Sequence, residues 1–277
     1  MPSVLNAMLR TIPWDWRHRI KSIPAVAHLQ RHLLSALLDG REFTHTVDAG
    51  PAKGIRFRIR LPEDKGIWTG TYELDFAKRL AASVRQGAVA YDIGSWHGFF
   101  AGVMAAQGAR EVIVFEPLPA NADRIRALIA LNPDHSISLY PVAVGDRDTE
   151  MDLVVMPETS MAKLAASEFQ PAVTSPRRIR TRVRSIDSMV QSGEAPPPAL
   201  VKIDVEGVEL LVLQGARETL RTHRPEIFAE IHSAALLESC TCFLAEAGYR
   251  IELLDAEPAA ARATGIHQIR ASAGTAA

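Results

Sequence analysis

The strongest constraint on the fold is an alternation of apolar, strand-like runs with helix-like segments from residue 88 onward. The apolar runs, each ending in a polar turn, are AVAYDIG, EVIVFEP, SISLYPVAV, ALVKIDVEG and PEIFAEIH. Amphipathic segments such as ANADRIRALIALNP and GVELLVLQGARETLRTH lie between them. Apolar strands that alternate with helices predict an α/β fold, in which a mostly parallel sheet carries helices on both faces.

Two regions depart from this alternation. YRIELL (249–254) and GIHQIRA (265–271) are separated by a segment too short for a helical crossover, so they predict an antiparallel hairpin at one edge of the sheet. MDLVVM and RIRTRVRSI predict a second pair of strands within residues 150–187. The alternating arginines of RIRTRVRSI indicate one wet face, which is typical of an exposed edge strand.

The chain divides into three parts in this interpretation: a helical N-terminal extension (1–50), a main domain (51–270) and a disordered tail (271–277). The extension contains RTIPWDWRHRIKS, a mildly basic segment with interleaved tryptophans. Such a segment packs on its own domain, on a second subunit in a dimer, or on a membrane surface. The sequence predicts neither a transmembrane run nor a secretion signal, so we expect a cytoplasmic location.

The overall charge argues against a nucleic-acid substrate. Lys plus Arg number 31 and Asp plus Glu number 32, giving a formal net charge of −1. A function on nucleic acid would rest only on the arginine row at 178–184. Cys240 and Cys242 have the wrong spacing for a disulfide or a four-ligand metal site, so we interpret them as packing residues.

Ligands of open parallel sheets bind beyond the carboxyl ends of the strands, and this rule selects the candidate site residues. The residues at or near predicted strand ends are Asp92, Glu116, Val142, Asp204, Glu230 and His232. All but one of these are polar or titratable. The sequence therefore predicts a polar site along one edge of the sheet.

The first turn, YDIGSWHGFF (91–100), limits the choice of cofactor. A triphosphate loop needs Lys and Ser or Thr after its last glycine, and a dinucleotide turn needs a third glycine. The turn has neither, and Asp92 would repel a pyrophosphate but attract a cation such as S-adenosylmethionine. Glu116, at the next strand end, could bind the ribose of either cofactor. A nicotinamide-dependent oxidoreductase and a purely structural turn remain the alternatives.

Several segments together resemble the FkbM family of S-adenosylmethionine-dependent methyltransferases. They are VAYDIGSWHGFF, VIVFEPLPANADRIRALIALN, LYPVAVGD, LVKIDVEGVELLVLQGA and RPEIFAEIH, and the resemblance spans about residues 70 to 235. It implies a Rossmann-like class I methyltransferase fold with strand order 3-2-1-4-5-7-6 and strand 7 antiparallel. It also implies methylation of a hydroxyl of a sugar, glycan or secondary metabolite.

The resemblance also assigns roles to individual residues. Asp92, Gly94 and Gly98 would line the methionine end of the cofactor, Glu116 would hold the ribose, Val142 and Ala143 would border the adenine, and Asp204 would face the methyl group. Tyr72, Glu73, Ser95 and Pro117 complete the expected cofactor-binding set. Trp96 and His97 depart from the family's usual turn residues, and Trp96 either stacks on a ligand or packs on the preceding helix.

An alcohol acceptor needs a base, and Asp204, Glu206, Glu230 and His232 are the candidates. His232, with an ordinary pKa near 6.5, is the expected proton acceptor, and Glu230 or Asp204 would orient it. Alternatively, Glu230 caps a helix and His232 is structural. The same groups could hold Mg²⁺, but the imidazole makes this the weaker alternative, and we expect no metal. A non-catalytic, cofactor-binding partner subunit is the remaining rival.

Overall fold

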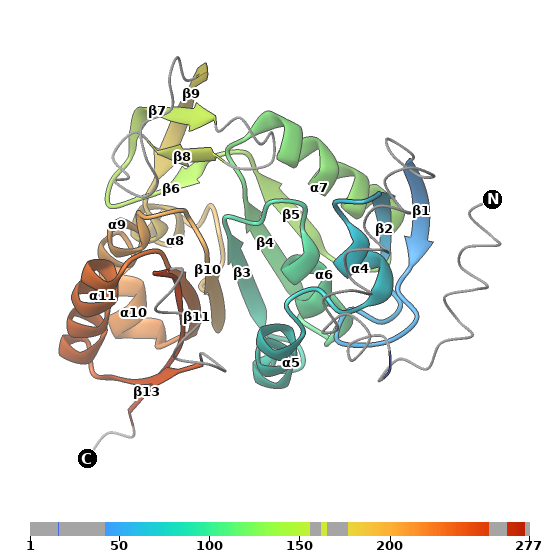
Figure 1. Ribbon diagram of the computed structural model, residues 1–277. Helices are drawn as coiled ribbons and strands as arrows, with labels where there is room; N and C mark the ends of the chain where they lie inside the picture. Colours follow the sequence, from blue (N-terminus) through green and yellow to red (C-terminus); the bar gives the residue numbers. More distant parts are fainter. Residues whose placement is uncertain (1–15, 17–41, 156–161, 165–176, 255–264, 275–277) are drawn as a thin grey trace.

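The computed structural model describes residues 16, 42–155, 162–164, 177–254 and 265–274 (Figure 1). Its centre is a seven-stranded sheet with the order β12-β13-β11-β10-β3-β4-β5. The strands are β3 (Val89–Ile93), β4 (Glu111–Phe115), β5 (Ile137–Tyr140), β10 (Leu200–Ile203), β11 (Glu226–Ile231), β12 (Tyr249–Leu253) and β13 (His267–Ala273). Counted along the chain within this sheet and read from β5, the order is 3-2-1-4-5-7-6.

The strand directions also agree with the predicted fold class. β5, β4, β3, β10 and β11 are parallel, and β13 runs antiparallel to both β11 and β12. The predicted terminal hairpin is confirmed, because Ile251 pairs with Ala271 across β12 and β13. The parallel strands direct their carboxyl ends to one edge of the sheet, which is where a site is expected.

Helices cover both faces, because the strands are apolar on both sides (Figure 1). On one face, Ala90 and Val112 pack with residues of α5 (Leu74–Ser83), α6 (Phe99–Ala106) and α7 (Pro119–Leu131). On the other face, Tyr91 and Phe115 pack with residues of α8 (Ile186–Gln191), α9 (Glu209–Gln214), α10 (Arg217–His223) and α11 (Ala234–Glu246). This produces a three-layer arrangement with one hydrophobic cluster on each side of the sheet.

A smaller sheet is inserted between β5 and α8. It contains β6 (Ala143–Val144), β7 (Thr149–Val155), β8 (Ala162–Leu164) and β9 (Arg177–Arg184) in the order β6-β9-β7-β8. β9 lies between two strands, so its interpretation as an edge strand is wrong. Arg178, Arg180 and Arg182 do face solvent, and Arg180 lies 3.4 Å from both Glu150 and Asp152 of β7. Arg178 also pairs with Asp152, so these two arginines are matched by acids of the neighbouring strand.

The predicted domain boundaries need two corrections. Residues 42–46 are not helical: β1 (Glu42–Thr46) pairs antiparallel with β2 (Arg56–Arg60), and His45 and Val47 are buried. Apart from Trp16, the rest of the predicted helical extension up to residue 41 lies outside the described residues. At the other end, β13 continues to Ala273, which pairs with Tyr249, so residues 271–273 belong to the sheet. The remaining tail, 275–277, lies outside the described residues.

Candidate active site

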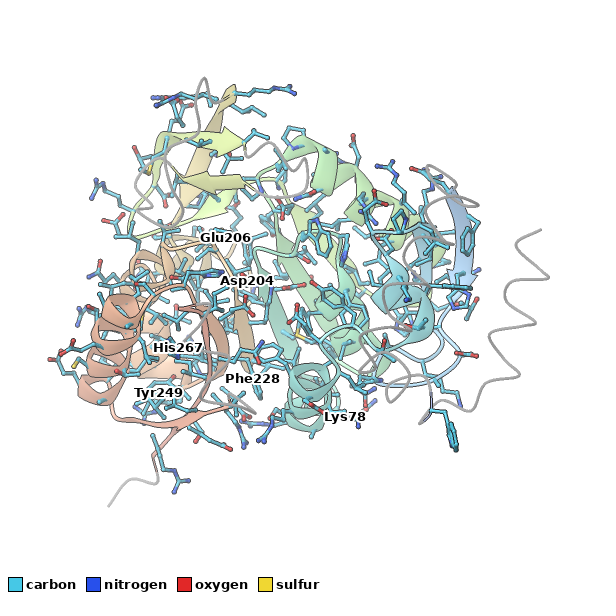
Figure 2. The ribbon with its side chains drawn as sticks, in the orientation of Figure 1. Lys78, Asp204, Glu206, Phe228, Tyr249 and His267 are labelled. Atoms are coloured by element: carbon cyan, nitrogen blue, oxygen red, sulfur yellow. The ribbon has the colours of Figure 1, made fainter. Side chains whose placement is uncertain are left out.

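A cavity of about 330 Å³ lies at the carboxyl ends of β3, β4, β10 and β11. The predicted site residues that line it are Tyr72, Glu73, Gly94, Glu116, Pro117, Val142, Ala143, Asp204, Glu206 and Glu230. Figure 2 shows Asp204 and Glu206 near the centre of the molecule. The small sheet also contributes to the wall, through Val144 of β6 and Leu153 of β7. The sequence therefore identified most of the residues of this cavity.

Gly94 allows the ends of β3 and β10 to approach each other closely. Its φ is +73°, and a Cβ at this position would lie 1.7 Å from the carbonyl oxygen of Asp204. A side chain would thus clash with backbone and would also adopt an unfavourable conformation. The glycine is required for the shape of the cavity floor, independently of any ligand.

Asp92, Ser95 and Gly98 do not line the cavity. The Asp92 carboxylate is fully buried, accepts hydrogen bonds from Ser95 Oγ (2.5 Å) and the Ala101 amide (3.0 Å), and lies 3.5 Å from Lys202 Nζ. Asp92 thus holds the turn to the start of α6, because its charge is directed to internal partners. The structure does not place Asp92 in the cavity lining, whose acids are Glu73, Glu116, Asp204, Glu206 and Glu230.

Glu116, at the end of β4, is held on the cavity wall by backbone donors. Its two carboxylate oxygens accept hydrogen bonds from the amides of Trp96 and Leu118, each at 2.9 Å. Burial raises the pKa of Glu116 to about 7, although these hydrogen bonds oppose the shift. The side chain is therefore fixed before any ligand arrives.

The wall beside Glu116 is apolar, with Phe115, Val142, Ala143, Leu153 and Val208 among its members. Among the described residues that line the cavity, none is Lys, Arg or His. A phosphate-bearing ligand would therefore find no cation to pair with. The part of the cavity between these apolar residues, called the apolar slot below, suits a flat, uncharged ring.

His232, at the end of β11, lies behind the cavity wall among four carboxyl groups. Its Nδ1 is 2.7 Å from Glu209 Oε1, and its Nε2 is 3.6 to 3.7 Å from oxygens of Asp204, Glu206 and Glu230. Burial works against protonation, but Glu209 and the other acids raise the pKa of His232 to about 9. The raised pKa favours the cationic form of His232 over the neutral base that the sequence predicted.

Glu206 and Glu230, like Glu116, are residues of the cavity wall whose pKa is raised towards neutrality. Burial, together with neighbouring acids such as Asp204, raises the pKa of each to about 7. Asp204, Glu230 and His232 also place three potential metal-ligand atoms within 4.8 Å of one another. This donor set fits Mg²⁺ poorly, because Mg²⁺ prefers oxygen ligands and one of the three donors is an imidazole nitrogen.

Backbone strain is concentrated at this cavity. Glu73 (φ 38°), Trp96 (φ 52°) and Glu206 (φ 55°) are three of the four non-glycine residues with positive φ in the described part of the chain, and all three line the cavity. Positive φ is costly for residues of this size and is typical of functional sites. The strain supports a functional role for this cavity that its shape alone would not establish.

The sequence analysis missed two charged residues that organise the site. Lys202, only 3% exposed, donates to the carbonyl oxygen of Gly94 at 2.9 Å and lies 3.3 Å from Asp204. Glu209 is fully buried and pairs with His232. Each stands in an apolar run, ALVKIDV and VELLVL, where a buried charge requires a partner. A charged residue within an apolar run was therefore the sequence feature that could have identified Lys202 and Glu209.

Comparison with known proteins assigns the family. The model of the methyltransferase FkbM domain matches residues 88–251, which is more than half of the chain. The chain belongs to this methyltransferase family. A curated relative, the hexuronic acid methyltransferase AglP of Haloferax volcanii, is 29% identical over 182 residues, covering 65% of this chain and 71% of AglP. The predicted family is thereby confirmed, and methyltransferase is its shared activity.

Solved structures give a weaker likeness. The methyltransferase FkbM of Methylobacillus flagellatus KT aligns with a TM-score of 0.48 and 15% identity, covering 91% of this chain and 60% of its own. The Pyrococcus abyssi tRNA (uracil-54, C5)-methyltransferase, solved with S-adenosyl-L-homocysteine, aligns with a TM-score of 0.46 and 13% identity, covering 83% of this chain and 43% of its own. The chain thus spans under two thirds of either structure.

Among the described residues of this methyltransferase, no helix combines the length and apolar character required to cross a bilayer.

Proposed function

We propose that this chain is an S-adenosylmethionine-dependent O-methyltransferase that acts on a hydroxyl group of a sugar or glycan. The observation that carries the proposal is the two-part cavity, with Glu116 and an apolar slot on one side and a carboxylate cluster on the other. The family assignment and the name of the relative AglP support it. A dinucleotide is disfavoured, because no described residue of the cavity wall could neutralise its phosphates.

The residues present fit the methyl donor. Glu116 would accept hydrogen bonds from the ribose, Val142 and Ala143 would border the adenine, and Asp204 would face the cationic end. When bound, S-adenosylmethionine supplies a methyl group on a positively charged sulfur. The surrounding carboxylates favour that charge, and Gly94 keeps the cavity floor open beside it.

Glu206 and Glu230 would take the proton of the acceptor hydroxyl. Both line the cavity, and a pKa of about 7 lets each accept a proton at neutral pH. A bound methyl donor would supply the methyl group to the acceptor oxygen, and the proton that the hydroxyl loses would pass to one of these two carboxylates. His232 would act by holding these carboxylates together with its positive charge, rather than as the base.

Two measurements on the purified full-length chain test the proposal. Calorimetry is expected to show binding of S-adenosylhomocysteine and no binding of NAD. Incubation with methyl-labelled donor and a panel of sugars is expected to transfer label to oxygen. NAD binding without S-adenosylhomocysteine binding would support the oxidoreductase instead. Binding of S-adenosylhomocysteine with no transfer to any acceptor would support a non-catalytic subunit.

A further inference from the structure

We propose that the acceptor is a neutral or amine-bearing sugar that stacks on an aromatic face formed by Trp96 and Tyr72, and that the site rejects sugars carrying an acidic group. This inference deepens the function proposed above and rests on it. It combines two features of the cavity lining: a pair of aromatic side chains and an excess of carboxyl groups.

The aromatic face is built from a strained residue. Trp96 and Tyr72 both line the cavity, with ring centroids 5.9 Å apart and planes inclined by 41°. Trp96 is held at a φ of 52°. Its indole Nε1 is shielded from solvent and has no hydrogen-bond partner within the described part of the chain. A ligand in the cavity would therefore meet the carbon face of the indole, and the C–H face of a sugar ring would cover it.

The cavity lining also carries acids that no cavity-lining base balances among the described residues. Five carboxyl groups line the cavity, those of Glu73, Glu116, Asp204, Glu206 and Glu230, and no Lys, Arg or His does so among the described residues. Carboxylates accept hydrogen bonds from sugar hydroxyls and pair with ammonium groups. They repel a substrate carboxylate, sulfate or phosphate at the same distances.

The two nearby cations are directed away from a substrate. Lys202 Nζ binds the carbonyl oxygen of Gly94 and lies 3.3 Å from Asp204 and 3.5 Å from Asp92. Its side chain is 3% exposed. His232 is 2% exposed, with Nδ1 on Glu209 and Nε2 directed towards three other carboxylates. Neither cation can pair with an acidic sugar without first losing its own partners.

This inference predicts that the chain and its relative AglP differ in the charge of the sugar that they accept. The name of AglP states a hexuronic acid, a sugar that carries a carboxylate. At 29% identity the two proteins can share the transfer chemistry and differ in the acceptor. We therefore expect the same methyl donor but the opposite preference for substrate charge.

The test uses matched sets of methyl glycosides in the gluco, galacto and manno configurations. Each set contains the neutral sugar, the 2-amino sugar and the uronic acid, so only one substituent changes. Label transfer and binding in the presence of S-adenosylhomocysteine are measured for every sugar. The neutral or amino sugar of the best set is expected to exceed its uronic acid by at least about tenfold in kcat/KM, which corresponds to about 1.4 kcal/mol.

A uronic acid that is the best member of its set would overturn the inference. Absence of binding and transfer for every sugar, with S-adenosylhomocysteine still bound, would also overturn it, while leaving a methyltransferase with a different acceptor. Failure to bind S-adenosylhomocysteine would instead remove the function on which the inference depends. These outcomes are distinguishable in one series of experiments.

Variants test the two features separately. Trp96→Asn tolerates the left-handed backbone and removes the ring. This variant is expected to raise the KM for the sugar at least about tenfold and to leave the Kd for S-adenosylhomocysteine within about twofold. Trp96→Phe should have an intermediate KM. If Trp96→Asn raised the Kd for S-adenosylhomocysteine as much as the KM for the sugar, the Trp96 ring would contact the methyl donor. That result would contradict the proposed stacking of the ring on the acceptor sugar.

Glu73→Gln is expected to reduce the ratio of kcat/KM between the neutral sugar and its uronic acid. The control Glu238→Gln, at an exposed position, should leave this ratio unchanged.

Discussion

The two halves of the cavity solve the problem of buried charge in opposite ways. In the β3–β4 half, Glu116 accepts hydrogen bonds from two backbone amides, each at 2.9 Å. In the β10–β11 half, Asp204, Glu206 and Glu230 surround His232 at 3.6 to 3.7 Å, beyond hydrogen-bond distance. One half is satisfied before a ligand binds, and the other is held together mainly by electrostatic attraction.

This difference indicates that the two halves of the cavity have different roles in binding and in proton transfer. A side chain that is fixed by backbone donors suits recognition of a constant group, because no reorganisation is needed on binding. Carboxylates that are crowded and protonated near neutrality suit proton transfer, because a small change in the site moves a proton. The following predictions test the contrast, from the largest expected effect to the smallest.

Removing a proton acceptor is expected to have the largest effect. Glu230→Gln or Glu206→Gln keeps the shape of the wall but removes a base, so we expect kcat to fall by about 10² to 10⁴ for the variant that lacks the true base. Steady-state kinetics with the best acceptor measure it, and the Kd for S-adenosylhomocysteine serves as the control. Full turnover in both variants would contradict the catalytic role of this half.

Gly94→Ala tests the close approach of the β3–β4 half to the end of β10. The added Cβ would meet the carbonyl oxygen of Asp204 at 1.7 Å, so we expect a loss of unfolding free energy of about 3 kcal/mol or more. Gly193→Ala is the matched control: its φ is +72°, but nothing lies within 4 Å of the added atom. It should lose only about 1–2 kcal/mol, from backbone strain. Equal losses in urea unfolding would show that the close approach to β10 is unimportant.

Glu209→Gln tests how the imidazolium is maintained. Without the carboxylate at Nδ1, the pKa of His232 is expected to fall from about 9 by about 1 to 2 units. NMR titration of the His232 ring measures this shift. The alkaline limb of the pH–rate profile should move to lower pH with it, and Glu209→Asp should restore part of both. An unchanged titration would mean that Glu209 only fills space.

The pH dependence of stability tests the raised pKa of Glu206. Because its folded pKa of about 7 exceeds the ordinary value of 4.5, its contribution to stability is present below pH 4.5 and is lost as the pH rises to about 7. Glu206→Gln should therefore gain stability relative to the parent at pH 8 compared with pH 5, by about 2–3 kcal/mol. Melting temperatures should shift by about 2–4 °C per kcal/mol. Glu238→Gln should show no such trend.

Chelation is expected to have no effect. The donor set around His232 does not suit Mg²⁺. Glu206 or Glu230 would accept the hydroxyl proton, so the proposed transfer requires no metal. Turnover should be the same with EDTA and with added Mg²⁺ or Mn²⁺. A loss of activity with EDTA that a divalent cation restores would show that the carboxylate half is a metal site.

The sequence predicted the sheet well, because its central strands are apolar on both faces and are followed by polar turns. The general rule for ligands at strand ends identified Glu116, Asp204 and Glu230. The sequence did not predict the raised pKa of His232, because that shift depends on Glu209 of α9. It also assigned one helix over α9 and α10, where the structure has a break. A Cβ at Gly215 would lie 2.0 Å from the Gly145 carbonyl, a tertiary contact that no local pattern reveals.

Lys202 has a consequence for protein engineering. Its single ammonium group serves an acid of each half, Asp92 and Asp204, and also the backbone of Gly94 between them. A chimera that exchanges only one half with another enzyme would leave this lysine facing a mismatched neighbour. Successful grafts should therefore move the β3 turn and the β10 end as one cassette, with the lysine included.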